Sequence, residues 1–245
     1  MAHFQQLKYV ETVRDFFPHY FSKKRVLEVG SWNVSGSVRQ FFAECDYLGV
    51  DVSPGPGVDL VCFGQDLDCP DKSFDIVISC ECFEHNPAWV ETFNNMHRML
   101  KDDGLFVLTC ATYGRREHGT PRRSMDSSLT SETEGGAYYL NLGMKDLLEA
   151  IPVDQIFSDY RFFYNHFSRD FYFVGFKSSA ANVKPEAIEQ FAAAVKNIKR
   201  DRPVGFAEDF FKKLKFQILY SLTKVIGDKA YQDFRYALSS KSKSK

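Results

Sequence analysis

The sequence lacks an excess of charge of either sign. Its 245 residues include 31 Lys and Arg and 32 Asp and Glu, which gives a formal net charge of −1 at pH 7. Proteins that hold DNA or bulk RNA usually display a basic face, because phosphates attract cations. We therefore expect a small-molecule partner and no nucleic acid.

The sequence also lacks long apolar runs and matched cysteine pairs. No stretch of about 18 apolar residues occurs, so we expect neither secretion nor stable insertion in a membrane. Most of the six cysteines lie in or beside apolar runs, where a free thiol behaves as a small hydrophobe. Cys80 and Cys82 have no second pair at zinc-ligand spacing. These absences predict reduced thiols, a cytoplasmic location and no bound metal.

The most informative feature that is present is an order of strand, turn, helix, strand and acid. Residues 26–29 predict a buried strand, and Gly30 lets the backbone turn sharply beside a ligand. Residues 35–45 predict the following helix, and residues 47–50 predict a second strand that ends at Asp51. About twenty residues separate the turn from this acid, the spacing at which a carboxylate reaches a ribose hydroxyl pair. This order is typical of sheets that hold an adenosine-bearing cofactor.

Strands and helices continue to alternate along the first half of the chain. Apolar residues at helical spacing predict an opening helix from Phe4 that Pro18 ends or kinks. Further strands are expected at residues 58–63, 74–79 and 105–110, and a helix capped by Gly104 is expected from residue 89. Because parallel strands need crossover connections, we expect an α/β fold, an open, doubly wound and mostly parallel sheet with helices on both faces.

The second half of the chain predicts additions to this sheet. Residues 111–137 are polar and too long for an ordinary connection, so we expect a lid or substrate loop. Residues 142–151 predict a short helix. Residues 159–165 and 171–177 predict an antiparallel hairpin at the sheet edge, which brings the sheet to seven strands.

We expect two structural units, a domain over residues 1–178 and a C-terminal helical appendage over residues 185–240. The second helix of the appendage carries an apolar stripe between residues 210 and 225, with lysines beside it. A membrane-surface helix has this pattern. We favour packing on the domain or on a second copy of the chain, as in a homodimer, because most apolar helical stripes are core faces.

Five segments that carry polar or small residues lie at the predicted carboxyl ends of the strands. They are residues 28–30, Asp51, residues 63–66, residues 79–85 and the chain from residue 111 onward. Ligands of open α/β sheets bind beyond these ends. We therefore expect the segments to meet at one crevice.

These residues resemble a known family, the seven-stranded class I S-adenosylmethionine-dependent methyltransferases, in particular the methyltransferase type 11-like members. Residues 26–30 (Val-Leu-Glu-Val-Gly) are similar to the family's first motif and residues 49–51 (Gly-Val-Asp) to its second. Residues 71–79 resemble its fourth strand and residues 98–105 the approach to its fifth, so the resemblance covers residues 20–177.

The resemblance implies S-adenosyl-L-methionine as the cofactor. It implies that Gly30 approaches the amino-acid part of the cofactor, that Asp51 accepts both ribose hydroxyls, and that Glu28 anchors the turn or the cofactor's ammonium through water. The implied cofactor-binding residues are Glu28, Gly30, Ser31, Trp32, Asp51, Val52, Phe63, Gly64, Asp66 and Ser79. If these two acids do not bind a cofactor, Asp51 is a turn or helix-capping acid and Glu28 is a buried carboxylate that pairs only with backbone groups.

The chain departs from the family pattern at two places. Trp32 and Val34 stand where the first loop usually has small residues, so the loop must run differently, and Trp32 either walls the site or plugs the core. After the third strand, Phe63 stands where relatives commonly place an acid that holds adenine. Adenine would then rest on Phe63, or Asp66 would substitute.

A dinucleotide-binding dehydrogenase is the main rival for the same pattern. The glycine pattern disfavours it, because a pyrophosphate needs close approach of bare backbone at several turn positions. A sulfonium cofactor carries no phosphate and tolerates Trp32 and Val34.

Methyl transfer to a hydroxyl needs a base beside an aligned acceptor. His118, in the loop after the fifth strand, and His85, after the fourth, are the candidate catalytic residues. The alternatives are a solvated loop histidine for His118 and a helix cap for His85. The same loop carries four arginines that are candidate ligands for an anionic acceptor: Arg115, Arg116, Arg122 and Arg123. The alternative is that these arginines form a solvated run of charges.

We predict an O-methyltransferase of a small molecule or glycan precursor. The Glu-His-Gly-Thr string at residues 117–120 resembles methyltransferases of bacterial surface-glycan loci, which act in polysaccharide biosynthesis and include enzymes that modify sugars or phosphoramidate groups. An N-methyltransferase is the nearest alternative, because an amine acceptor needs little help from a base. A scaffold that binds the cofactor without catalysis is the alternative from another class.

Overall fold

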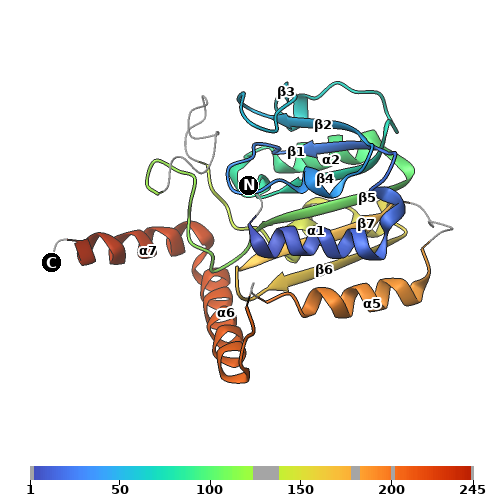
Figure 1. Cartoon of the computed structure of the whole chain (residues 1–245). Helices are drawn as coiled ribbons and strands as arrows, with labels where there is room; N and C mark the ends of the chain where they lie inside the picture. Colours follow the sequence, from blue (N-terminus) through green and yellow to red (C-terminus); the bar gives the residue numbers. More distant parts are fainter. Residues whose placement is uncertain (1–2, 124–137, 178–182, 200–201, 244–245) are drawn as a thin grey trace.

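A seven-stranded mixed sheet forms the centre of the molecule. The computed structural model describes residues 3–123, 138–177, 183–199 and 202–243 (Figure 1). The strands lie in the order β3-β2-β1-β4-β5-β7-β6. Their bounds are β1 Arg25–Val29, β2 Asp46–Asp51, β3 Leu60–Val61, β4 Phe74–Cys80, β5 Leu100–Ala111, β6 Asp159–Asn165 and β7 Asp170–Phe176. The first five strands are parallel, and β7 and β6 complete the sheet as an antiparallel hairpin, which confirms the predicted fold class.

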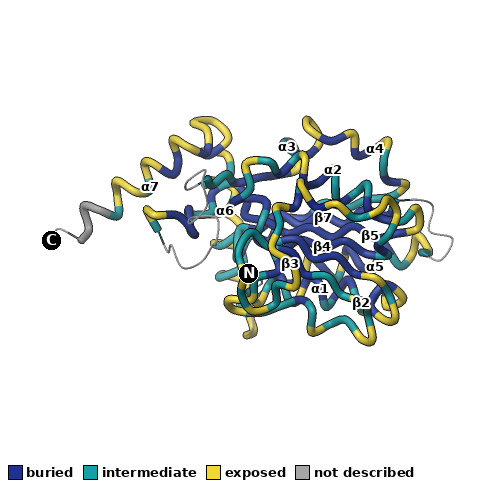
Figure 2. Tube along the Cα trace, turned by 90° about the horizontal axis from the view of Figure 1, so that it is seen from above, coloured by how far each residue is buried: buried dark blue, intermediate teal, exposed yellow. Residues whose placement is uncertain are grey.

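Helices cover both faces of the sheet. The α-helices are α1 Phe4–Phe16, α2 Trp89–Met99, α3 Met144–Ala150, α4 Val153–Ile156, α5 Pro185–Lys196, α6 Phe206–Ile226 and α7 Asp228–Lys243. The 3-10 helices are η1 Pro18–Tyr20, η2 Val38–Phe41, η3 Gly64–Asp66 and η4 Phe83–His85. α1 and α5 pack on one face, and α2, α3 and α4 pack on the other. The central strands β1, β4, β5 and β7 are buried over most of their length (Figure 2).

Aromatic stacking holds both helical layers to the sheet. On one face the ring of Tyr9 in α1 stacks on that of Tyr172 in β7, with centroids 4.4 Å apart. On the other face Phe93 in α2 stacks on Phe106 in β5, also at 4.4 Å. All four rings are buried, and full burial of such a side chain stabilises the fold by about 1.5–3 kcal/mol. The crevice at the carboxyl ends of the strands therefore stands on a rigid base.

Two local predictions were wrong. Residues 35–45 form only the 3-10 turn η2, because Gly36 has a positive φ of 152° and Phe42 is already extended. Ala43 then pairs with Ser22 in an isolated β-bridge, so the chain has no room for a longer helix. Gly104 is not a helix cap, because α2 ends at Met99 and β5 begins at once, with Gly104 inside the strand.

Of the two packing arrangements predicted for the C-terminal helices, α6 does not show packing of its apolar stripe on the domain, and packing on a second copy stays a prediction. α5 contributes Phe191 and other side chains to the core, whereas α6 and α7 extend away from the sheet (Figure 1). The apolar stripe of α6 does not cover the domain, and its members are exposed: Phe210, Phe211, Leu214, Ile218, Leu222 and Val225. Periodicity identifies an apolar helix face but not what the face meets.

Aromatic and polar side chains attach the two helices instead. Tyr220 in α6 contacts the rings of Tyr113 and Tyr164, and the Tyr231 hydroxyl in α7 donates to the Gly114 carbonyl at 3.0 Å. Among the described residues, none of the helices combines the length and the apolar character that crossing a membrane needs. Most of the predicted lid, residues 124–137, lies outside the described residues.

Candidate active site at the carboxyl ends of the strands

Asp51 lies at the carboxyl end of β2, where the backbone fixes its carboxylate. The Trp32 backbone N–H donates to Oδ2 at 2.9 Å, and the Val52 N–H donates to Oδ1 at 2.8 Å. Burial raises the pKa of Asp51, and the two backbone donors oppose this shift. Each carboxylate oxygen can accept a second hydrogen bond. The side chain is therefore held in one orientation with acceptor capacity left for a pair of hydroxyls.

Gly30 forms the turn beside Asp51. Its φ is +85°, and a Cβ at this position would lie 2.4 Å from the Cβ of Cys82. The N–H groups of Gly30 and Ser31 both donate to the Val50 carbonyl, at 2.8 and 3.2 Å, which ties the turn to β2. Ser31 Oγ is buried and has no hydrogen-bond partner among the described residues. A bare turn and a fixed carboxylate fit the amino-acid and ribose parts of the predicted cofactor.

The other predicted cofactor residues take different positions. Trp32 is half-buried over the turn at Gly55, where an added Cβ would come within 2.5 Å of the indole Nε1. Phe63 is exposed after β3 and open to a ligand, as is Asp66. Gly64 is buried against Val29, so its role is close packing.

Glu28 and Ser79 are buried within the sheet. Glu28 lies on the face covered by α1, and the Tyr47 hydroxyl donates to its Oε2 at 2.7 Å. Burial raises the pKa of Glu28 to about 7, although the Tyr47 hydrogen bond opposes the shift. The Ser79 hydroxyl donates to the Val29 carbonyl at 2.7 Å, which joins β4 to β1. Both side chains thus support the strands beneath the turn.

A buried ionic network occupies the carboxyl ends of β4 and β5. Arg115 donates to both oxygens of Glu81, at 2.8 and 2.6 Å, and also to Asp170 at the start of β7. Burial opposes ionisation of Glu81, but Arg115, His118 and His3 together outweigh it, so the pKa of Glu81 lies well below its ordinary value. Glu81 adopts a positive φ of 53°, a conformation that L-residues rarely hold without a structural demand. The network fixes the backbone on which the next residues stand.

The two predicted catalytic histidines lie side by side on this network. The rings of His85 and His118 meet edge to face with centroids 5.0 Å apart, and Tyr139 contacts both. His118 Nε2 lies 3.6 Å from Glu81 Oε2 and 4.0 Å from Glu84 Oε1. Burial lowers the pKa of His85 to about 3, so its imidazole is neutral near pH 7.

Glu84 is fully buried beside the two histidines. The Ala111 N–H donates to its Oε1 at 3.1 Å, while Oε2 has no partner among the described residues. Burial, and then the nearby charge of Glu81, raise the pKa of Glu84 well above its ordinary value. Neither Glu81 nor Glu84 was predicted to have a role. Their positions four residues and one residue before His85, at one strand end, were the available signal.

The four arginines after β5 do not form one patch. Arg115 is engaged by Glu81 and Asp170, Arg122 donates to Asp233 at 2.8 Å, and Arg123 donates to Ser239. Arg116 Nε is buried without a partner among the described residues. An anion site in this loop stays a prediction, with Arg116 as its most available member.

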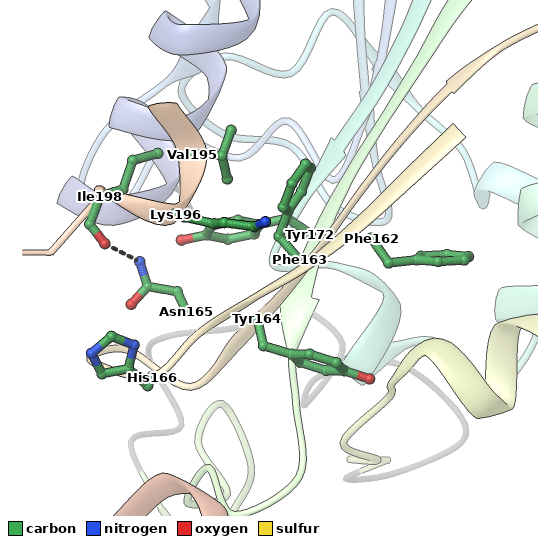
Figure 3. Close-up of a pocket in the computed structure, with 9 residues that line it drawn as sticks. All are labelled: Phe162, Phe163, Tyr164, Asn165, His166, Tyr172, Val195, Lys196 and Ile198. Atoms are coloured by element: carbon green, nitrogen blue, oxygen red, sulfur yellow. Dashed lines mark hydrogen bonds between the residues drawn. The ribbon is translucent and has the colours of Figure 1, made fainter. Parts of the chain in front are cut away.

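A cavity of about 300 Å³ lies elsewhere, between the β6–β7 hairpin and the end of α5 (Figure 3). Aromatic side chains such as Phe163 and Tyr172 line it, and the Asn165 amide donates to the Ile198 carbonyl at its rim, at 3.0 Å. None of the predicted cofactor or catalytic residues lines this cavity. We therefore place the site at the strand ends, where the polar groups converge.

Comparison with known proteins identifies a family. The profile of the family described as "Methyltransferase domain" matches residues 1–149. Comparison with the curated proteins gives no match.

Several solved structures are similar to this chain. The 1,6-didemethyltoxoflavin-N1-methyltransferase of Burkholderia thailandensis, with bound S-adenosylhomocysteine, is 16% identical over 69% of this chain and 77% of its own, with a TM-score of 0.47. The phosphoethanolamine N-methyltransferase 2 of Haemonchus contortus is 20% identical over 92% and 49%, with a TM-score of 0.48. The arsenic(III) S-adenosylmethionine methyltransferase of Chlamydomonas reinhardtii is 17% identical over 65% of each chain, with a TM-score of 0.42.

Proposed function

This chain belongs to the methyltransferase-domain family, and from that premise we propose that it transfers a methyl group from S-adenosyl-L-methionine to an oxygen of a small molecule or glycan precursor. When bound, the cofactor supplies an electrophilic methyl group on a sulfonium. The chain's own residues must then hold the nucleoside, place the acceptor in line and take up its proton.

The observation that carries the proposal is the fixed carboxylate of Asp51 beside the bare turn at Gly30. Two backbone N–H groups hold the carboxylate, and a ribose hydroxyl pair would add two charge-assisted hydrogen bonds. The exposed ring of Phe63 is available to the adenine. Trp32, over the adjoining turn, would close the side of the nucleoside site.

We assign to His118 and His85 the part of the site that binds the methyl acceptor, which we call the acceptor end. The His118 side chain is about one-fifth exposed, and its Nε2 lies 3.6 Å from Glu81 and 4.0 Å from Glu84, which would stabilise the imidazolium formed when the ring takes up a hydroxyl proton. His85 packs against it as a neutral ring that fixes its orientation. A placed base of this kind typically accelerates a reaction about 10²–10⁴-fold.

An anionic acceptor, such as an acidic sugar, a phosphate or a phosphoramidate, fits the arginine-rich loop beside His118. Arg116 supports this choice, because its guanidinium Nε lacks a partner among the described residues. Guanidinium groups bind such oxygens with two parallel hydrogen bonds.

The test uses isotope-labelled S-adenosylmethionine, the full-length chain and the small-molecule fraction of a cell extract. Mass spectrometry should detect a labelled methyl group on an oxygen of one product. His118→Ala should lower kcat about 10²–10⁴-fold, whereas His19→Ala, an exposed histidine remote from the crevice, should match the parent. A label found only on nitrogen would assign the alternative reaction, and a chain that binds S-adenosylhomocysteine but labels no fraction would indicate a scaffold.

A further inference from the structure

Three side chains at the acceptor end lie close enough to share one cation. One ligand atom from each of Glu84, His85 and His118 lies within 4.8 Å of the other two. Glu84 and His85 are neighbours in η4, and His118 comes from the loop after β5. Bonds of about 2.1 Å to a common ion place ligand atoms roughly 3–4 Å apart. The three side chains therefore need to close by only about 1 Å to coordinate one ion.

Two polar atoms of this group lack the partner that buried atoms normally have. Glu84 is fully buried and His85 is 3% exposed, yet Glu84 Oε2 and His85 Nδ1 make no hydrogen bond among the described residues. Native structures satisfy the large majority of buried side-chain polar atoms, and each exception calls for a physical account, of which an ion is one. Here both exceptions occur on adjacent residues of one cluster.

The orientation of His118 provides a second and independent indication. Its Nδ1 lies 3.3 Å from the Arg116 carbonyl, and since a carbonyl can only accept, Nδ1 carries the hydrogen. In a neutral ring Nε2 then presents a lone pair toward Glu81 and Glu84, at 3.6 and 4.0 Å. A lone pair that faces carboxylates is unfavourable, and either a proton on Nε2 or a cation between the groups removes the repulsion. Metal-bound histidines are usually fixed in this way, with the second ring nitrogen donating to a carbonyl or carboxylate.

The remaining described groups around the cluster leave Glu84 Oε2 and His85 Nδ1 without a partner. Glu81, Glu84 and Asp170 are three buried acids, and Arg115 contacts two of them, Glu81 and Asp170. A proton on His118 would serve Glu81, whose Oε2 lies 3.6 Å from its Nε2, but would leave Glu84 Oε2 and His85 Nδ1 unpaired within the described part of the chain. One divalent cation would give both atoms a partner.

We propose that Glu84, His85 and His118 bind one divalent transition-metal cation, with Glu81 within reach as a fourth ligand. Two imidazoles and a carboxylate suit ions such as Mn²⁺, Fe²⁺, Co²⁺ or Zn²⁺ better than Mg²⁺, which prefers oxygen ligands. Three protein ligands leave coordination positions open toward the crevice. This inference contradicts the expectation of no metal drawn from the cysteine spacing, because the ligands are histidines and an acid from two separate segments.

The metal's role, unlike its binding, rests on the proposed methyl transfer. An acceptor hydroxyl bound at an open position would be oriented by the ion and would lose its proton more readily. His118 would then act as a ligand instead of a free base. The two roles differ in one measurable property, since only the metal-dependent site loses turnover in a chelator and regains it with added ion.

Binding is tested on the full-length chain after removal of metals with EDTA and dialysis. Calorimetric titration with MnCl₂ should show one site per chain, and Glu84→Gln and His118→Gln should each weaken it at least about tenfold. Glu91→Gln, an exposed carboxylate on α2, is the matched control and should bind as the parent does. Titration of the same samples with S-adenosylhomocysteine reports on the nucleoside end, so failure there would count against the proposed function and not against the metal.

A spectroscopic measurement keeps the test independent of how the variants fold. Co²⁺ added to the unmodified chain should give visible absorption bands of a nitrogen-ligated ion, and Mn²⁺ should broaden the NMR signals of two histidine rings selectively. The proposal is overturned if the chain binds S-adenosylhomocysteine but neither Mn²⁺, Co²⁺ nor Zn²⁺. It is equally overturned if both variants bind metal with unchanged affinity.

Discussion

Replacing Glu28 with Gln should stabilise the protein at alkaline pH and leave it almost unchanged in acid. Glu28 is 4% exposed, and its pKa is raised by burial to about 7, while the unfolded chain has the ordinary value of about 4.3. A group whose pKa is raised on folding contributes stability that is fully present below the unfolded pKa. That stability is lost as the pH rises through the folded pKa.

The size of this change in stability follows from the difference between the folded-state and unfolded-state pKa values of Glu28. At about 1.4 kcal/mol per pKa unit, ionisation of Glu28 lowers the free energy of unfolding by about 3 kcal/mol between pH 4 and pH 8. Gln cannot ionise, and its amide oxygen still accepts from the Tyr47 hydroxyl, which the parent holds at 2.7 Å. Glu28→Gln should therefore exceed the parent by about 3 kcal/mol at pH 8 and by little at pH 4.

Urea denaturation across pH 4–8 measures the difference. Glu44→Gln is the control, because the Glu44 side chain is 75% exposed and should show no such pH-dependent gain. If Glu28→Gln is less stable than the parent at pH 8, or if its advantage does not grow with pH, folding does not raise the pKa of Glu28 and the reasoning fails.

Two further changes test the turn and the C-terminal attachment. Gly30→Ala should lower the free energy of unfolding by about 2–4 kcal/mol and weaken S-adenosylhomocysteine binding, because φ is +85° and the new Cβ would lie 2.4 Å from the Cβ of Cys82. Normal stability of this variant in thermal unfolding would contradict the prediction. Asp209→Asn should lower the free energy of opening of α6 by about 1 kcal/mol or less at pH 7, and faster amide hydrogen exchange in α6 would measure this change. Burial opposes ionisation of Asp209, but Lys213 and His166 lower its pKa to about 2. The parent's advantage should therefore shrink as the pH falls from about 4 through 2, and an advantage at pH 2 equal to that at pH 7 would contradict this explanation.

The parts of the fold that follow from local patterns were predictable from the sequence. The strand ending at Val29, the turn at Gly30 and the acid at Asp51 depend on residues close together in the chain, and all three lie where predicted. The edge hairpin likewise follows from two aromatic strands and a short turn. Residues 35–45 failed because helical periodicity does not register a pairing such as that of Ala43 with Ser22.

The acceptor end was predictable only in part. His85 and His118 were named as candidates, but the contacts that give the cluster its chemistry join segments far apart in the chain. Arg115 reaches Glu81 across 34 residues and Asp170 across 55, and no local pattern encodes such pairs. The burial of Glu84 and the missing partner of its Oε2 depend on the same packing.

The most direct test of the account is the affinity of the Asp51→Ala protein for S-adenosylhomocysteine, measured by calorimetry. Hydrogen bonds to a charged group contribute about 1.5–3 kcal/mol each, so loss of the ribose contacts should weaken binding by at least about tenfold. Asp46→Ala, an exposed acid at the other end of β2, should bind as tightly as the parent. An Asp51→Ala protein that is folded and holds the ligand with the parent's affinity would contradict the placement of the nucleoside at this strand end.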